Sequence, residues 1–89
     1  MFRLWGKTFQ NNHLLNDTVI CDDSDDTRTH KVQNGLRNIC YEFDLGMPIW
    51  LDKNITEFQR IAKTRFYSDS FVESIAFDYL EIQIIEEDF

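Results

Sequence analysis

The chain has 89 residues and a formal net charge of −7, and 43% of its residues are apolar. This length suits one hydrophobic core, so we expect a single domain over residues 1–89. The apolar content excludes an intrinsically disordered chain, and no segment approaches the roughly 18 apolar residues that a membrane-spanning helix needs. The negative charge argues against a nucleic-acid-binding protein, because binding to phosphates needs a basic surface.

The acidic excess lies at the C-terminal end. Residues 66–89 hold seven of the 16 acidic residues and none of the nine Lys and Arg residues. We interpret this segment as a solvated acidic surface, with attraction of a basic partner as the alternative.

The two cysteines, Cys21 and Cys40, form no CxxC pair and are too few for a disulfide scaffold. We expect two buried thiols. No N-terminal stretch combines basic residues with a long apolar run, as a secretory signal would. A cytoplasmic protein is therefore expected.

A β-hairpin is predicted at the start of the chain. Residues 2–9 alternate loosely between the two sides of a strand, the polar residues 10–13 interrupt the pattern, and residues 15–21 resume it as a second strand. Because residues 19–21 are all apolar, we expect the second strand to be the more buried one.

A helix is predicted from Thr27 onwards. Its apolar residues form one stripe at helical spacing: Val32, Leu36, Ile39, Cys40 and Phe43. Asp25 or Asp26 is expected to cap its start, and Gly46 to end it. Gly35, inside the helix, indicates close packing against the sheet.

A connector and a shorter helix are predicted next. Pro48 restricts residues 47–51 to a connector or an edge strand. Asn54 with Glu57 resembles a capping box, so we expect a helix that begins at Asn54. Its apolar stripe would be Ile55, Phe58, Ile61 and Ala62. Residues 64–75 fit no single pattern.

The last strand is predicted over residues 76–86, which alternate along their whole length. One side carries Leu80, Ile82 and Ile84, and the other carries Tyr79, Glu81 and Gln83. We expect Ile82 and Cys40 in the core. The predicted fold is α+β, with a small, mostly antiparallel sheet made of the N-terminal hairpin and the C-terminal strand, and two helices packed on one face.

The loop between Asp22 and Asp26 has four carboxylates in five residues. Such oxygens suit Ca²⁺ or Mg²⁺, but Thr27 and Gln33 stand where a calcium loop needs glycine and a bidentate glutamate. We therefore expect no metal, no cofactor and no catalytic residue, and interpret the loop as a helix-capping turn. A small enzyme or metal-dependent protein that uses this loop with His30 is the alternative. The spacings of His30 and the cysteines match no zinc signature.

The outward side of the sheet is the predicted interaction surface. It would display a mixed set of side chains: Arg3, Trp5, Lys7, Tyr79, Glu81 and Gln83. Aromatic anchors with a rim of Arg3, Lys7 and Glu81 are typical of surfaces that bind a protein partner or form a homo-oligomer. The alternatives are a plain solvated sheet face, or a face over which residues 64–75, with Phe66, Tyr67 and Phe71, fold.

Five segments together resemble a family of small uncharacterised bacterial proteins with no assigned activity. They are RLWGK at 3–7, TVICD at 18–22, TRTHK at 27–31, PIWL at 48–51 and FDYLEI at 77–82. The resemblance implies a compact bacterial cytosolic protein and transfers no site. Since no nucleophile, base and oxyanion donor occur at recognisable spacing, we expect a non-enzymatic interaction or accessory protein rather than an enzyme.

Overall fold

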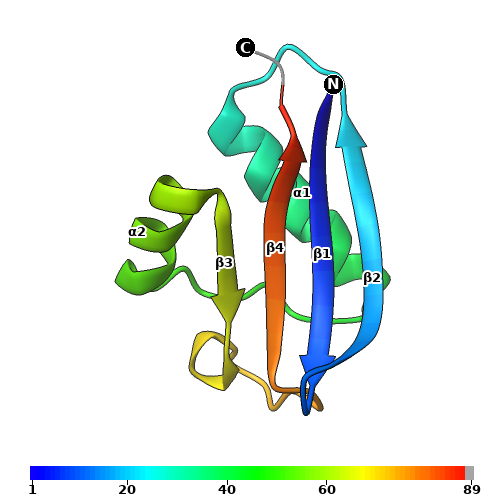
Figure 1. Cartoon of the computed structure of the whole chain (residues 1–89), viewed down its shortest axis with the longest axis vertical. Helices are drawn as coiled ribbons and strands as arrows, with labels where there is room; N and C mark the ends of the chain where they lie inside the picture. Colours follow the sequence, from blue (N-terminus) through cyan, green and yellow to red (C-terminus); the bar gives the residue numbers. More distant parts are fainter. Residues whose placement is uncertain (88–89) are drawn as a thin grey trace.

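The computed structural model describes residues 1–87 and contains a four-stranded antiparallel sheet and two α-helices (Figure 1). The elements occur in the order β1 (Phe2–Gln10), β2 (His13–Asp22), α1 (Arg28–Glu42), α2 (Asp52–Ile61), β3 (Lys63–Phe66), the 3-10 helix η1 (Ser68–Ser70) and β4 (Tyr79–Glu86). The strand order is β2-β1-β4-β3, and every neighbouring pair is antiparallel. The predicted α+β class with a small antiparallel sheet is confirmed, and β3 is an additional strand that the sequence did not predict.

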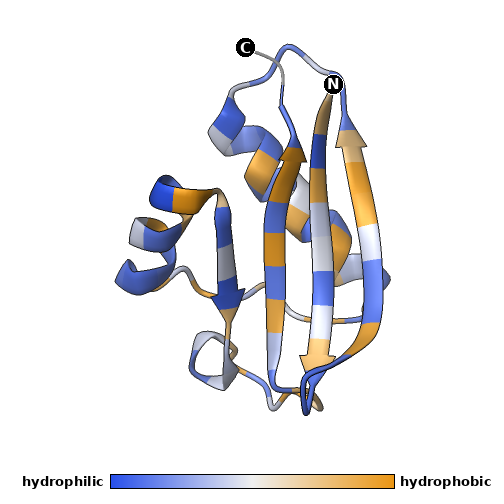
Figure 2. Ribbon diagram, viewed as in Figure 1, coloured by the Kyte–Doolittle hydropathy of each residue, from blue (hydrophilic) through white to orange (hydrophobic). Residues whose placement is uncertain are grey.

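α1 packs on one face of the sheet, and α2 lies at the β3 edge and contributes Phe58 to the same core. In the view of Figure 1, α1 crosses behind the long strands and α2 lies beside β3. Apolar and polar residues alternate along β4, as Figure 2 shows by the change of colour from residue to residue. The buried apolar side chains between helices and sheet are Phe2, Leu4, Val32, Leu36, Ile39, Cys40, Phe58, Phe66, Leu80 and Ile82. Cys40 and Ile82 are therefore core residues, as predicted.

The N-terminal hairpin turns tightly at Asn11 and Asn12. Both residues have positive φ, 51° and 65°, which asparagine tolerates better than most residues. The prediction that the second strand is the more buried one was wrong. β1 pairs with strands on both sides and is mostly buried, whereas β2 lies at the sheet edge and is mostly exposed. The order of the strands decides burial here, so the apolar residues 19–21 do not make β2 an inner strand.

Close approach of α1 to the sheet depends on two glycines. A Cβ atom at Gly35 would lie 2.8 Å from Leu4 Cδ2, and one at Gly6 would lie 2.6 Å from Ile39 Cγ2. Real side chains do not pack that closely. A side chain at Gly6 would require most of the Ile39 side chain to move, whereas at Gly35 the end of the Leu4 side chain would have to shift. The close packing predicted from Gly35 is confirmed.

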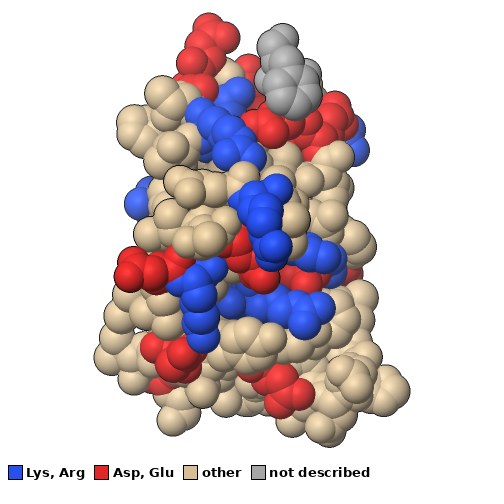
Figure 3. Space-filling model, turned by 60° about the vertical axis from the view of Figure 1, so that its left-hand side comes forward, with Lys and Arg blue, Asp and Glu red and all other residues tan. Residues whose placement is uncertain are grey.

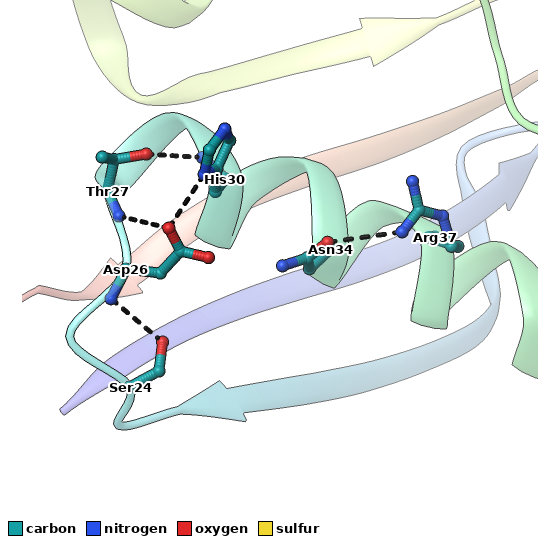
Figure 4. Close-up of polar contacts among 6 residues, drawn as sticks. All are labelled: Ser24, Asp26, Thr27, His30, Asn34 and Arg37. Carbon is teal, nitrogen blue, oxygen red and sulfur yellow. Dashed lines mark hydrogen bonds and ion pairs between the residues drawn. The ribbon is translucent and has the colours of Figure 1, made fainter.

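The start of α1 differs in detail from the prediction. Thr27, not Asp25 or Asp26, is the N-cap residue, and its Oγ1 accepts a 3.2 Å hydrogen bond from the His30 backbone N–H (Figure 4). Asp26 instead accepts the backbone N–H of Thr27 at 2.8 Å. The cap therefore lies one residue beyond the acidic loop, at a threonine, which is also a favoured N-cap residue.

The helix α2 also begins earlier than predicted. Its N-cap is Leu51, and Asn54 lies inside the first turn, where its Oδ1 accepts the Leu51 backbone N–H at 3.0 Å. Of the predicted apolar stripe, Phe58 is buried, but Ile55 and Ile61 are 43% and 47% exposed. The buried side of α2 is formed by Asn54 and Phe58, and the helix packs mainly against the short edge strand β3.

The segment between the helices is a connector, as Pro48 indicated. It is joined to η1 by a 2.7 Å hydrogen bond from the Ile49 N–H to the Ser70 carbonyl oxygen. Trp50 then packs edge-on against Phe58 and Phe66, at centroid distances of 5.5 and 5.1 Å. Neither α-helix in residues 1–87 is long and apolar enough to cross a lipid bilayer.

Candidate functional site

The candidate site is the face of the sheet opposite α1, which we call the open face. Side chains alternate along each strand, so the antiparallel register places one residue from each of four strands in a row. The middle row is Asp17, Lys7, Glu81 and Arg65 from β2, β1, β4 and β3, and we call it the charge ladder. The row on one side is Leu14, Phe9 and Tyr79, continued by Tyr67 after β3, and we call it the aromatic row. The third row is Val19, Trp5, Gln83 and Lys63.

The centre of the charge ladder is a buried ion network. Lys7 Nζ lies 2.7 Å from Glu81 Oε2, and Arg65 Nε lies 2.9 Å from Glu81 Oε1. Lys7 and Glu81 are only 7% and 4% exposed, whereas Arg65 reaches solvent. One carboxylate, Glu81, therefore pairs with two cations, and Asp17 lies opposite Lys7 as the second acid of the ladder.

The electrostatics of this network act on the pKa of both Glu81 and Arg65. Burial would raise the pKa of Glu81, but the hydrogen bonds and charges of Lys7 and Arg65 outweigh it and lower the pKa. The hydrogen bond to Glu81 raises the pKa of Arg65. Glu81 and Arg65 are therefore both charged at neutral pH.

Trp5 is held on the open face by polar partners. Its Nε1–H donates to Asp17 Oδ2 at 3.0 Å, and Lys7 Nζ lies 3.7 Å from the centre of its ring. Lys7 also donates to Gln83 Oε1 at 3.3 Å. Three strands thereby fix the half-buried indole in one position.

The aromatic row is continuous from strand to strand. The Phe9 and Tyr79 rings stack at 5.2 Å, and Tyr67 packs on Tyr79 at 5.4 Å. The Arg65 guanidinium lies 4.6 Å from the centre of the Tyr79 ring. The ends of the row are exposed, with Leu14 at 48% and Tyr67 at 40%.

All six residues of the predicted interaction surface lie on the open face, but the predicted polar rim was partly wrong. Lys7 and Glu81 are buried in the centre because each neutralises the other between neighbouring strands. Arg3 does lie at the margin, where it forms a 3.1 Å ion pair with Glu86.

The alternative in which residues 64–75 fold over this face is not what the structure shows. Phe66 is buried in the core on the other side of the sheet, and Phe71 packs against that core. Of these three aromatic side chains, Tyr67 is the one that lies on the open face.

Sequence reasoning missed seven of the twelve residues in these three rows. Phe9, Leu14, Asp17 and Val19 follow once the β1–β2 register is known. Lys63, Arg65 and Tyr67 depend on β3, which did not stand out in the sequence.

Basic residues continue around the edge of the sheet toward α2. A hollow of about 330 Å³ there is lined by Lys53, Asn54, Glu57, Ile61, Lys63, Arg65 and Tyr67. Figure 3 shows Lys and Arg side chains gathered across the middle of this side of the molecule, with acidic side chains among them. The acidic protein thus presents a locally basic region beside the open face.

The acidic loop forms a turn. Asp22 Oδ1 accepts the Ser24 N–H at 2.9 Å, and the hydrogen bonds from Ser24 lower the pKa of Asp22. Asp26 lies 2.8 Å from His30 Nδ1, and this contact is the main cause of its lowered pKa (Figure 4). Residues 1–87 contain no group of three or more His, Cys, Asp or Glu side chains that could hold a metal ion. The loop and His30 are therefore not gathered into a metal centre.

The prediction of two buried thiols was wrong for one of them. Cys40 is buried, and burial raises its pKa to about 11, whereas Cys21 is exposed on the edge strand β2. Neither is part of a nucleophile–base pair among the described contacts.

Comparison with protein-family models, with curated proteins and with solved structures finds no match to this chain. The geometry of the open face is therefore the basis for the functional assignment.

Proposed function

We propose that the chain is a non-enzymatic interaction protein that binds a protein partner through the open face of its sheet. The observation that carries this proposal is the charge ladder on the side of the sheet opposite α1, in which the buried pair Lys7–Glu81 is joined by the exposed Arg65. Buried ionic groups are costly to form and specify geometry more than they add stability. A fixed charge pattern on an uncovered surface suits recognition.

Exposed apolar side chains beside the ladder support the same conclusion. Leu14, Val19 and Tyr67 are 48%, 41% and 40% exposed and lie in the two rows that flank the ladder. Apolar groups around fixed charges are typical of the centre of a protein interface. Because hydrogen bonds and ring contacts already hold Trp5 and Tyr79, binding would cost little side-chain entropy.

A protein partner fits this face better than a single-stranded nucleic acid. Base stacking needs free aromatic ring faces. On the open face, Lys7 lies over Trp5, and both Arg65 and Phe9 lie against Tyr79. As part of the proposal we place the protein in the cytoplasm, where the free thiols Cys21 and Cys40 would stay reduced.

The test compares a variant of the open face with a matched variant of the helical side. Leu14→Lys/Val19→Lys changes two exposed residues of β2, and Tyr41→Lys/Ile55→Lys makes the same kind of change on α1 and α2. Each tagged protein is purified from cells that also express an untagged copy of the same chain. Co-purifying proteins, the untagged copy included, are identified by mass spectrometry after circular dichroism has confirmed the fold.

We expect at least one partner to co-purify with the wild type and with the helical-side variant but not with the open-face variant. Equal retention by all three proteins, or equal loss from both variants, would overturn the proposal.

A further inference from the structure

The open face displays an alternating order of charges from one edge of the sheet to the other. Along the charge ladder the signs are negative for Asp17, positive for Lys7, negative for Glu81 and positive for Arg65. Reversing the order of the strands therefore inverts every sign. A surface with this property is complementary to a reversed copy of itself.

We infer that the partner of the open face is a second copy of the same chain. The two copies would be related by a two-fold axis that lies between their open faces, runs parallel to the strands and passes over the boundary between β1 and β4. This inference rests on the proposed function and names its partner. The rotation places β2 of one copy over β3 of the other, and β1 over β4. Asp17 then faces Arg65 of the second copy, and Lys7 faces Glu81. Every position of the ladder meets the opposite charge.

The other simple two-fold arrangement is disfavoured by the same charges. An axis that lies in the face at right angles to the strands and passes through the ladder would place each strand over its own counterpart. Lys7 would then face Lys7, and Glu81 would face Glu81. Like charges would meet at all four positions, which costs energy and excludes this orientation.

The flanking rows are compatible with the favoured arrangement. In the aromatic row, Phe9 would face Tyr79 and Leu14 would face Tyr67 of the second copy, so apolar groups meet apolar groups. In the third row, Trp5 would face Gln83, and Val19 would meet the aliphatic stem of Lys63. Two facing sheets pack with their strands nearly aligned and about 10 Å apart, which leaves room for these side chains to interdigitate.

The exposed members of the ladder would make the contact between copies. Asp17 and Arg65 lie at opposite edges and are exposed, whereas Lys7 and Glu81 are already paired within each copy. Each dimer would contain two symmetry-related Asp17–Arg65 pairs. From strand and residue spacings the face measures roughly 400 Å², which is below the roughly 800 Å² per partner of a typical stable interface. A dissociable dimer in the micromolar range is therefore expected.

The test uses sedimentation velocity over a concentration series from about 1 μM to about 1 mM, with the wild type and charge-swap variants. Asp17→Arg places arginine over arginine in a self-dimer, and Arg65→Asp places aspartate over aspartate. Mixing these two variants restores opposite charges at both contacts. Asp25→Arg makes the same change of charge in the acidic loop and serves as the control.

We expect concentration-dependent dimers for the wild type and the control. The dissociation constant should rise at least about tenfold for each swap variant alone, and the mixture should recover heterodimers. Two-dimensional NMR spectra verify that each variant is folded, and Asp17→Asn replaces Asp17→Arg if the latter is not.

A wild type that remains monomeric throughout, swap variants that dimerise like the wild type, or a mixture that recovers nothing would overturn the inference. A monomeric wild type that still captures a different protein through the open face would refute the second copy and leave the proposed function standing. A monomeric wild type without any partner lost from the open-face variant would refute both.

Discussion

Lys7 and Glu81 lie directly opposite each other on β1 and β4, and a 2.7 Å ion pair joins them on the face that the helices leave open. Desolvation of two charges is costly, and the second partner of Glu81, Arg65, offsets part of that cost. The network is asymmetric, because Glu81 has two cationic partners while Lys7 has one carboxylate.

Because of this asymmetry, removing the charge of Glu81 and removing the charge of Lys7 should lower the free energy of unfolding by different amounts. Glu81→Gln leaves Lys7 buried beside Arg65 without a counter-charge and should lower the free energy of unfolding by about 3 kcal/mol. Lys7→Met leaves the Arg65–Glu81 pair in place and should cost clearly less. Urea unfolding of both variants measures the difference. Equal costs would show that Arg65 does not support Glu81.

The lowered pKa of Glu81 predicts a dependence of stability on pH. Because its pKa in the folded state lies below the ordinary value of 4.5, Glu81 contributes stability above that pH and loses it as the pH falls through the folded-state pKa. The stability difference between the wild type and Glu81→Gln should therefore be constant near neutrality and shrink below pH 4.5. Unfolding curves at several pH values test this. A difference that persists unchanged in acid would contradict the ionised state of Glu81.

The contact between Gly6 and Ile39 predicts overpacking when a methyl group is added. Gly6→Ala should destabilise the protein by about 1–3 kcal/mol, since the new Cβ would lie 2.6 Å from Ile39 Cγ2. In an Ile39→Ala background the same change should cost much less, because the obstructing atoms are gone. Gly46→Ala is the control, since nothing lies within 4 Å of a Cβ there. Additive effects of Gly6→Ala and Ile39→Ala would contradict direct contact.

The different environments of the two cysteines predict a thiol count. One thiol per chain should react rapidly with a disulfide reagent in the native protein, and the second only after unfolding, since Cys40 is buried and its pKa is raised to about 11. Cys21→Ser should abolish the rapid reaction, and Cys40→Ser should preserve it. Two rapidly reacting thiols would show that α1 leaves the sheet on the time scale of the assay.

Periodicity was sufficient to predict the longer elements and the orientation of the last strand. The stripe of α1 and the alternation around Ile82 both depend on residues close in sequence, and both are confirmed. The open face could be predicted for the same reason, since Trp5 and Glu81 are on the outward side of their own strands.

Features that depend on pairing between distant segments could not be predicted. Burial of Lys7 requires β1 to lie between β2 and β4, which no local pattern encodes. The strand β3 has four residues, two of them basic, and is too short to show the alternation of a strand. Arg65, and with it the complete charge ladder, was therefore missed.

Asn54 was expected to cap a helix and instead joins α2 to β3, which yields the last prediction. It is 1% exposed, and its Nδ2 donates to Thr64 Oγ1 at 2.9 Å and to the Arg65 carbonyl oxygen at 2.8 Å. Its Oδ1 accepts the Leu51 N–H, so all polar atoms of its side chain are hydrogen-bonded.

Asn54→Ala leaves these buried groups without partners and should lower the free energy of unfolding by about 2–4 kcal/mol. Asn54→Asp keeps the acceptor for Leu51 but loses both donors and sets a carboxylate against a carbonyl oxygen, so it should cost a similar amount. Asn38→Ala, at an exposed position of α1, should change stability by less than about 0.5 kcal/mol. If urea unfolding finds Asn54→Ala as stable as Asn38→Ala, α2 is held to the sheet by Phe58 alone, and the ladder residue Arg65 is positioned without the help of Asn54.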